Sequence, residues 1–583
     1  MPEPHGHLFH VELAVEQPGD AIVLALPVWT PGSYLVREFA RHVEGFAAED
    51  ASARPLEVER LDKHRFRVAS RGAPLARIRY RVFAHELTVR TCHLDGSHGF
   101  FNGAGLLLYA EGRAREAHVL EVVPPPGWRV STAFAPAGPD TGGRWLFSAR
   151  DYDELVDSPV EIGRHELAAF SVHGKPHAIA LWGRGADLGR LAGDARTIVE
   201  HFAGFMGGLP YERYLFIVHL NASGRGGLEH ATSSTLLVKR TGFFPRDAYL
   251  ETLGLLAHEF LHVWNVKGLR PAALVPYDYA REQYTRLLWW FEGVTSYYEE
   301  LALVRARLAD PQRYLKHLGE ELTALARLPG AAKMSLEEAS LTAWVKFYRP
   351  DENSPNSAVS YYQKGELVAL ALDLMLRGSG GTLDDLLRAL YRRHTDGGLP
   401  EDGVERAVAE VVGRDNARAF FDRHVRGTGP VAMDLEPVGL TVKRRRAQAF
   451  DDKGGTPGKA EPGPQPGWLG ASLGSGPKLA VSAVREGSPA WRAGLYADDE
   501  IVAESGFRVD RAALWDRLCE RGPQGSLQLT VFRRDELVQV PVQLAEPPED
   551  TLWLEPVETP TDAQRSAFEA WCGASLPARG VAR

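Results

Sequence analysis

Cysteine is nearly absent from this chain. Only Cys92, Cys519 and Cys572 occur in 583 residues, and none of them belongs to a C-x-x-C pair. Three widely spaced cysteines cannot build a disulfide framework, and they offer no cysteine-rich metal site. The sequence therefore favours a reducing compartment.

Long apolar runs and an excess of basic residues are also missing. No run reaches the roughly 18 apolar residues that span a bilayer, and residues 1–7 lack the basic and apolar regions of a signal peptide. We therefore expect a cytoplasmic protein with no membrane-spanning segment. The net charge of −9 gives no electrostatic basis for nucleic acid as the main partner.

The composition that remains is that of an ordinary globular protein with several domains. Hydrophobic residues make up 44% and charged residues 25% of the chain, and the length predicts about three or four domains. Short alternating strands separated by Pro/Gly turns predict an N-terminal β-sandwich over residues 1–170. Residues 171–435 mix strands with long helices, so the expected fold class is multidomain α+β.

The C-terminal part divides into three segments by composition. Residues 436–466 are rich in Gly, Pro and charge, which predicts a flexible linker. Residues 467–546 have the pattern of a compact β-rich module with one helix at Arg511–Arg521. Residues 547–583 are expected to form a partly helical tail.

The strongest motif is His258-Glu259-x-x-His262, inside an apolar helical run that extends from about Asp247 to Trp264. Positions i and i+4 share one face of a helix, so the two imidazoles can bind one Zn²⁺ with Glu259 beside them. The alternative is a helix with two buried core histidines. The hydrophobic helical context favours the zinc interpretation.

A zinc site of this kind needs a third protein ligand. The run Trp289–Tyr298 is apolar and helix-like, and Glu292 is its only acidic residue. An unpaired carboxylate is costly to bury, and a metal ion would explain its presence there. His258, His262 and Glu292 would then form the two-His, one-Glu ligand set of a catalytic zinc.

Two weaker signals flank these helices. Gly226 and Gly227 follow a strand and allow another backbone to approach, while Glu229 just after them could recognise a cation such as a peptide's α-ammonium. The alternative is a turn with a solvated carboxylate. Tyr362 begins a long apolar helix, where its hydroxyl could reach into a cleft or the ring could simply pack.

Two further segments in the N-terminal region have open interpretations. His93 and His98 lie near Asp95, and they could bind a metal or form a polar loop. The Pro-Gly turn within Trp29–Tyr34 lies between aromatic residues, a pattern typical of a structural turn.

The motifs together resemble a known family. His258-Glu259-x-x-His262, Glu292-Gly293 and Tyr362-x-Lys364-Gly365 resemble the gluzincin metallopeptidases, the clan of thermolysin and the alanyl aminopeptidases. Gly226-Gly227-Leu228-Glu229-His230 resembles the exopeptidase motif of the latter. The closer resemblance, over nearly the whole chain, is to the bacterial glycyl aminopeptidases with a C-terminal PDZ domain. Further matches are Trp29-x-Pro31-Gly32-Ser33-Tyr34, Tyr152–Pro159 and Gly487-Ser488-Pro489-Ala490.

This resemblance implies a thermolysin-like catalytic domain over 171–435, a PDZ-like domain over 467–546 and one Zn²⁺ per chain. It implies that Glu259 activates water, that Tyr362 stabilises the tetrahedral intermediate, and that Glu229 with Gly226 and Gly227 binds the free N-terminus of a peptide. The expected function is a zinc-dependent aminopeptidase that removes an N-terminal Gly or Ala. A peptide C-terminus is an expected partner of the PDZ-like domain.

Two alternatives remain at this level. The first is a zinc endopeptidase of the same clan, from which Glu229 distinguishes an aminopeptidase. The second is a non-catalytic, PDZ-bearing peptide-binding scaffold, against which Glu259 and Tyr362 argue. The chain also departs from the patterns it resembles, since Phe291 stands where the alanyl enzymes usually have Asn, and Asp498 where PDZ domains usually have Gly. Aspartate tolerates left-handed backbone, so we expect the turn at Asp498 to survive.

Overall fold

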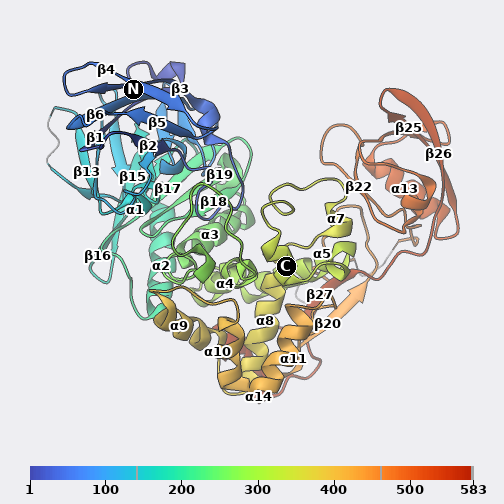
Figure 1. Cartoon of the computed structure of the whole chain (residues 1–583). Coiled ribbons are helices and arrows are strands. Elements are labelled where there is room, and N and C mark those ends of the chain that lie inside the picture. Colours follow the sequence, from blue (N-terminus) through green and yellow to red (C-terminus); the bar gives the residue numbers. More distant parts are fainter. Residues whose placement is uncertain (139–141, 460–462, 580–583) are drawn as a thin grey trace. The chain divides into compact units, whose positions relative to one another are not determined.

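The computed structural model describes residues 1–138, 142–459 and 463–579. The chain forms two compact units (Figure 1). The first comprises residues 1–285 and 387–401, and the second comprises residues 286–386 and 402–583. Both strands and helices contribute, which confirms the expected multidomain α+β class. Among the described helices, none combines the length and apolar character needed to cross a bilayer.

The first unit begins with a β-rich region, drawn in blue and cyan in Figure 1. A sheet with the order β1-β6-β3-β4-β5-β2-β9 is accompanied by two smaller sheets, β10-β13-β12 and β11-β14-β8-β7. Alternate residues of β6 are buried, as expected for a sheet with one face on a core. The bounds are β1 Leu8–Glu16, β2 Ile22–Ala25, β3 Val43–Asp50, β4 Pro55–Arg60, β5 Arg65–Ala69, β6 Leu75–Phe83, β7 Cys92–Leu94, β8 His98–Phe101, β9 Tyr109–Ala110, β10 His118–Val122, β11 Arg129–Thr132, β12 Ala135–Pro136, β13 Trp145–Ala149, α1 Tyr152–Val156 and β14 Val160–Gly163.

A five-stranded mixed sheet follows, with the order β15-β16-β17-β19-β18. Strands β16, β17 and β19 are parallel, and β17 and β19 are almost wholly buried, whereas β18 is antiparallel and lies at one edge. Helices α2 and α3 pack against this sheet. The bounds are β15 Glu166–Val172, β16 Lys175–Trp182, α2 Leu188–Met206, β17 Tyr214–Asn221, β18 Gly226–Glu229, β19 Ser233–Lys239 and α3 Arg246–Leu261.

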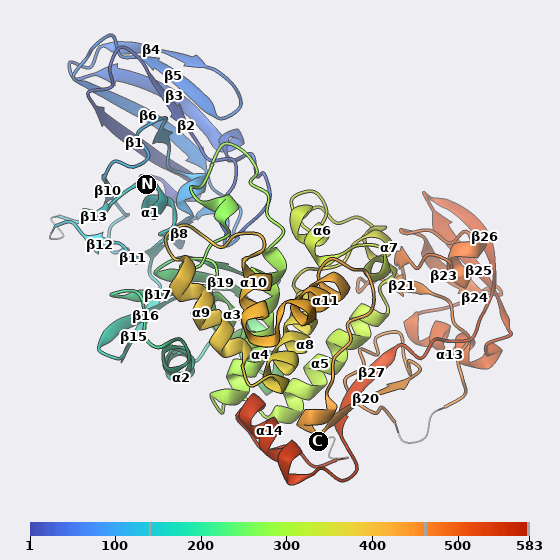
Figure 2. The same cartoon turned by 60° about the horizontal axis from the view of Figure 1, so that its bottom comes forward.

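The second unit is mainly helical. Its helices surround α8, which is buried along most of its length, and Figure 2 shows α4, α5 and α8 side by side. The bounds are η6 Trp289–Gly293, α4 Val294–Arg305, α5 Pro311–Ala326, α6 Leu336–Leu341, α7 Ser354–Ser357, α8 Gln363–Gly378, α10 Gly403–Val412, α11 Arg414–His424 and α14 Asp562–Cys572; α9, at Leu383–His394, carries residues of both units.

Two regions differ from the sequence-based expectation. Residues 404–426 have one continuous helical sequence pattern, but the structure divides them into α10 and α11, because Gly413 adopts a positive φ of 85° that a right-handed helix cannot contain. The range expected as a linker contains strand β20, Leu440–Arg445, which pairs with β27, Thr551–Pro556, from the expected tail. The tail also includes α14, whose Trp571 donates a hydrogen bond to the Tyr297 hydroxyl at 2.8 Å.

The β-rich module between β20 and β27 has its own apolar core. Its single longer helix, α13, spans Arg511–Arg521, as the sequence predicts. Asp498 adopts φ +69°, which confirms that aspartate accommodates the left-handed turn. The bounds are β21 Ala471–Leu473, β22 Val481–Val484, α12 Pro489–Ala493, β23 Glu500–Glu504, β24 Phe507–Arg508, β25 Ser526–Arg533 and β26 Glu536–Gln543.

Candidate active site

Helix α3 carries both histidines of the H-E-x-x-H motif in its last turn. Their rings lie 4.8 Å apart between centroids, and both side chains are buried. His262 is the C-terminal cap of the helix, and its Nδ1 donates a 2.7 Å hydrogen bond to the carbonyl oxygen of Asn265. Because a carbonyl can only accept, the Nδ1 of His262 carries the proton and Nε2 keeps a lone pair. His262 is therefore held in the tautomer of a metal ligand.

Glu259 lies against the backbone of edge strand β18. A Cβ built on Gly227 would lie 1.9 Å from a carboxylate oxygen of Glu259, so a larger residue at this position would force the Glu259 side chain to shift. For Glu229 the sequence left open a cation-binding residue or a solvated turn; the structure places it in strand β18, in the same neighbourhood as Glu259. Glu229, Glu259 and His262 each offer a ligand atom within 4.8 Å of the others. The structure thus brings together three of the residues singled out from the sequence.

The Glu229 carboxylate is buried and incompletely paired. The side chain is 4% exposed, and its Oε1 has no hydrogen-bond partner among the described residues. The turn at Gly32 covers it, since a Cβ on Gly32 would overlap both carboxylate oxygens. Gly32 also has φ +86°, a backbone conformation that other residues rarely adopt. A buried carboxylate in this state is ready to accept a cation.

A buried ion pair fixes the turn that follows Glu229. Asp157 accepts hydrogen bonds from the Lys267 ammonium at 2.6 Å and from the Ala231 backbone N–H at 2.8 Å, and its Oδ1 lies 3.1 Å from Nδ1 of His230. Burial opposes the charge of Asp157, but Lys267 and His230 hold the pKa of Asp157 at about 2. Asp157 therefore ties the end of β18 to the segment after α3.

Glu292 and Tyr362 belong to the second unit. Glu292 is 2% exposed and lies in the π-helical turn η6, a feature that often marks a functional position. A Cβ on Gly293 would lie 2.5 Å from the Cα of Gly365, so η6 and the start of α8 approach closely. Tyr362 immediately precedes α8, is half-buried, and stacks on Phe347 with ring centroids 5.2 Å apart.

Two peptidase-domain models match this sequence. The Peptidase M61 N-terminal domain matches residues 1–164, and M61 glycyl aminopeptidase matches residues 251–368. A solved structure of an aminopeptidase N family protein from Idiomarina loihiensis is 34% identical, with 98% of each chain covered and a TM-score of 0.91. The chain belongs to the M61 glycyl aminopeptidase family. It is a hydrolase, a metallopeptidase of the aminopeptidase type.

Similarity beyond the M61 family is distant. An M1 zinc metallopeptidase from Deinococcus radiodurans is 14% identical, with a TM-score of 0.46, and 74% of this chain and 93% of that chain are covered. No curated protein matches the sequence significantly.

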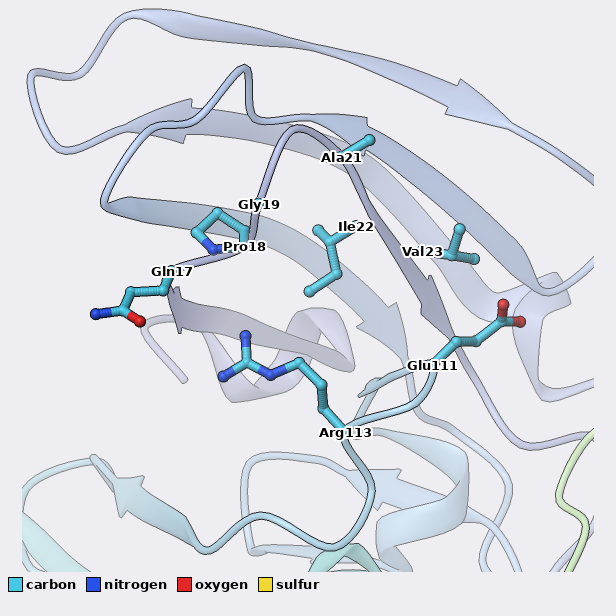
Figure 3. Close-up of a pocket in the computed structure, with 8 residues that line it drawn as sticks. All are labelled: Gln17, Pro18, Gly19, Ala21, Ile22, Val23, Glu111 and Arg113. Carbon is cyan, nitrogen blue, oxygen red and sulfur yellow. The ribbon is translucent and has the colours of Figure 1, made fainter.

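A separate pocket of about 430 Å³ lies in the N-terminal region of this M61 peptidase (Figure 3). It contains none of the site residues named above. Its charged residues already have partners, since Arg113 pairs with Glu116 at 2.6 Å and Glu111 pairs with Arg65 at 2.6 Å. We therefore assign no chemistry to this pocket.

The sequence did not reveal every residue that shapes the M61 site. Gly32 belongs to a turn interpreted as structural, and its contact with Glu229 depends on long-range folding. Asp157 lies in the matched run Tyr152–Pro159 and Lys267 lies five residues after His262, but neither had an assigned role. A buried Lys–Asp pair has no local sequence signature, so only the tertiary structure identifies it.

Proposed function

We propose that this M61 peptidase removes the N-terminal residue from peptides, using one Zn²⁺ bound by His258, His262 and Glu292. Each of these three side chains is buried, and His258 and His262 lie side by side at the end of α3, which supports the assignment. The donor set also fits zinc, because two neutral imidazoles and one carboxylate leave a coordination position open. The Nδ1 hydrogen bond of His262 supports the same assignment.

The zinc ion, when bound, supplies a Lewis acid that polarises the scissile carbonyl and lowers the pKa of the attacking water. Glu259 accepts the proton of that water and delivers it to the leaving amine. Its close fit against Gly227 supports this role, because it restricts where the carboxylate can lie. Tyr362 donates a hydrogen bond to the developing oxyanion.

The observation that carries the aminopeptidase assignment is the buried Glu229 carboxylate with an unpartnered oxygen near Glu259. Glu229 accepts the α-ammonium of the substrate, so that cleavage falls one residue from the N-terminus. Gly226 and Gly227 lie on the edge strand β18, whose outer backbone groups can pair with an extended peptide. An endopeptidase would have no use for a buried anion at this position.

We also propose a preference for Gly or Ala as the released residue. The match to the glycyl aminopeptidase model supports this preference. The backbone of Gly32 against Glu229 supports it as well, because the turn restricts the space beside the bound ammonium.

The test is release of a chromogenic amine from glycyl-, alanyl- and leucyl-anilides, with and without a chelator, for wild type and Glu259→Gln. We expect chelator-sensitive turnover that favours the glycyl and alanyl substrates and is lost in the variant. Zinc-loaded protein that cleaves an N-acetylated peptide internally, but none of the anilides, would instead establish an endopeptidase. Bound zinc without turnover on any substrate would establish a scaffold.

For the C-terminal module we propose a PDZ-like fold that binds a peptide C-terminus. The loop Trp468–Gly470 precedes strand β21, and a peptide would add as a strand between this sheet and α13. Arg511 at the start of α13 already donates hydrogen bonds to the carbonyls of Leu473 and Gly474, at 3.2 and 2.5 Å. Titration of a library of free C-terminal peptides against matched C-terminal amides tests the proposal, because only the free acids should bind.

A further inference from the structure

A second cluster of metal-ligating side chains lies buried between two sheets of the first unit, among residues that the proposed reaction does not use. It consists of His98 at the start of β8, Glu161 in β14, His219 in β17, and His165 just after β14. The side chains of His98, Glu161 and His219 are 0% exposed, and those three residues each offer a ligand atom within 4.8 Å of the others.

The strand pattern explains why these residues meet. In β8, His98 shares a face with Phe100, and in β17, His219 shares a face with Leu215 and Ile217. Phe100, Leu215 and Ile217 belong to one apolar cluster between the two sheets. Gly163 pairs with His98 across the ladder, and a Cβ there would lie 2.9 Å from the Cβ of His98. The cluster therefore lies at the end of the apolar layer between the two sheets, where polar side chains replace the apolar ones.

The charge of Glu161 is compensated only by imidazoles. Its two oxygens lie 3.1 Å from Nδ1 of His98 and 2.8 Å from Nε2 of His219, and Nδ1 of His165 lies 3.8 Å away. Among the described residues, no lysine or arginine forms an ion pair with it. Burial opposes an isolated charge, so a fully buried carboxylate whose partners are all imidazoles is a candidate metal ligand.

His165 lies beside the three ligands, with its Nδ1 3.8 Å from a Glu161 oxygen. Its Nε2 lies 2.7 Å from the Ser131 hydroxyl, and Nδ1 has no hydrogen-bond partner among the described residues. Ser131 therefore fixes the ring of His165 next to Glu161. His98 is likewise fixed, because it stacks on Trp182 with ring centroids 3.8 Å apart.

We propose that His98, His219 and Glu161 bind a second divalent transition-metal ion, of which zinc is the best match. Ligand atoms on one tetrahedral zinc lie about 3.3 Å apart for bonds of about 2.0 Å, close to the two Glu161 distances. All three ligand side chains are 0% exposed, so we assign this ion a structural role. It joins β8 and β14 of the N-terminal region to β17 of the five-stranded sheet. Asp95, near His98 in the sequence, instead accepts hydrogen bonds from Ser97 and from the His98 backbone.

Metal content per chain tests this inference, which is independent of the peptidase proposal. Elemental analysis of protein dialysed without chelator should give about two equivalents for wild type and about one for the His258→Ala/His262→Ala double variant. Glu161→Gln combined with His219→Asn should also reduce wild type to about one equivalent. His177→Asn, at a buried histidine of the same sheet that pairs with Tyr211, is the matched control and should keep two.

The outcomes separate the two zinc assignments. If wild type holds one metal equivalent per chain, and the folded His258→Ala/His262→Ala variant holds none, the second site is refuted and the catalytic site is supported. One equivalent in both would support the buried site and contradict zinc at the H-E-x-x-H helix. If the Glu161 variant fails to fold, cobalt substitution of the His258→Ala/His262→Ala variant decides, because a bound tetrahedral cobalt gives intense visible absorption and an absent one gives none.

Discussion

Gly227 and Glu259 are in direct contact, with the backbone of edge strand β18 occupying the place where any side chain at position 227 would meet the carboxylate. The contact therefore places the proposed general base, Glu259, against the strand that we propose binds the peptide substrate. It also means that the position of Glu259 depends on a residue that has no functional group of its own.

Gly227→Ala should lower kcat on glycyl-anilide about a hundredfold, because a displacement of about 1 Å at a catalytic group costs on this order. Gly226→Ala is the matched control, since its Cβ would meet only Arg90 at 3.8 Å. Steady-state kinetics on both variants, with metal content verified, provides the measurement. Equal losses in the two variants would show that the contact with Glu259 is not important for the reaction.

Glu229→Gln should lower kcat/KM for unblocked peptides by about a hundredfold or more, because truncating one partner of a buried charge pair costs about 2–5 kcal/mol. Any residual cleavage of N-acetylated peptides should be unaffected, since these substrates have no ammonium. Glu212→Gln, at an exposed glutamate of the same region, should behave like wild type. A Glu229 variant that loses activity on both substrate classes alike would refute ammonium recognition.

Gly32→Ala should affect both stability and substrate affinity. A Cβ at this position would overlap Glu229, and the φ of +86° adds backbone strain. Gly19→Ala is the matched control. Gly19 has a similar φ of +74°, but a Cβ there would have no atom within 4 Å, so this variant measures the effect of backbone strain alone. We expect KM for glycyl-anilide to rise several-fold in Gly32→Ala only. Matching KM values in the two variants would mean that the turn does not shape the substrate site.

Asp157 should contribute a pH-dependent part of the stability. Its pKa falls from the ordinary 3.8 to about 2 in the folded chain, so the contribution of about 2 kcal/mol is present above about pH 4 and is lost as the pH falls toward 2. Asp157→Asn should therefore lower the thermal midpoint at pH 7, and the difference from wild type should shrink at pH 3. Asp422→Asn, at an exposed ion pair with Arg426, should show little change at either pH.

The sequence predicted the local parts of the site better than their assembly. The spacing of His258 and His262 on an apolar helix depends on neighbouring residues alone, so α3 and its two imidazoles were predictable. The contact between Gly32 and Glu229 and the salt bridge between Asp157 and Lys267 join distant segments, and no periodicity encodes them. The same limit applies to β20, whose partner β27 lies beyond the intervening module.

The pairing of β20 with β27 makes the C-terminal module an insertion within a β-ribbon. Arg445 and Thr551 are register partners, so the chain leaves and re-enters the ribbon at adjacent points. The host ribbon is anchored to the helical body independently, because the Thr323 hydroxyl of α5 donates to the Leu552 carbonyl and accepts from the Leu552 N–H in β27. In such an architecture the module can be lost, exchanged or acquired in evolution as one unit. A short hairpin could then connect β20 to β27, and the helices that carry Glu292 and Tyr362 would be unchanged.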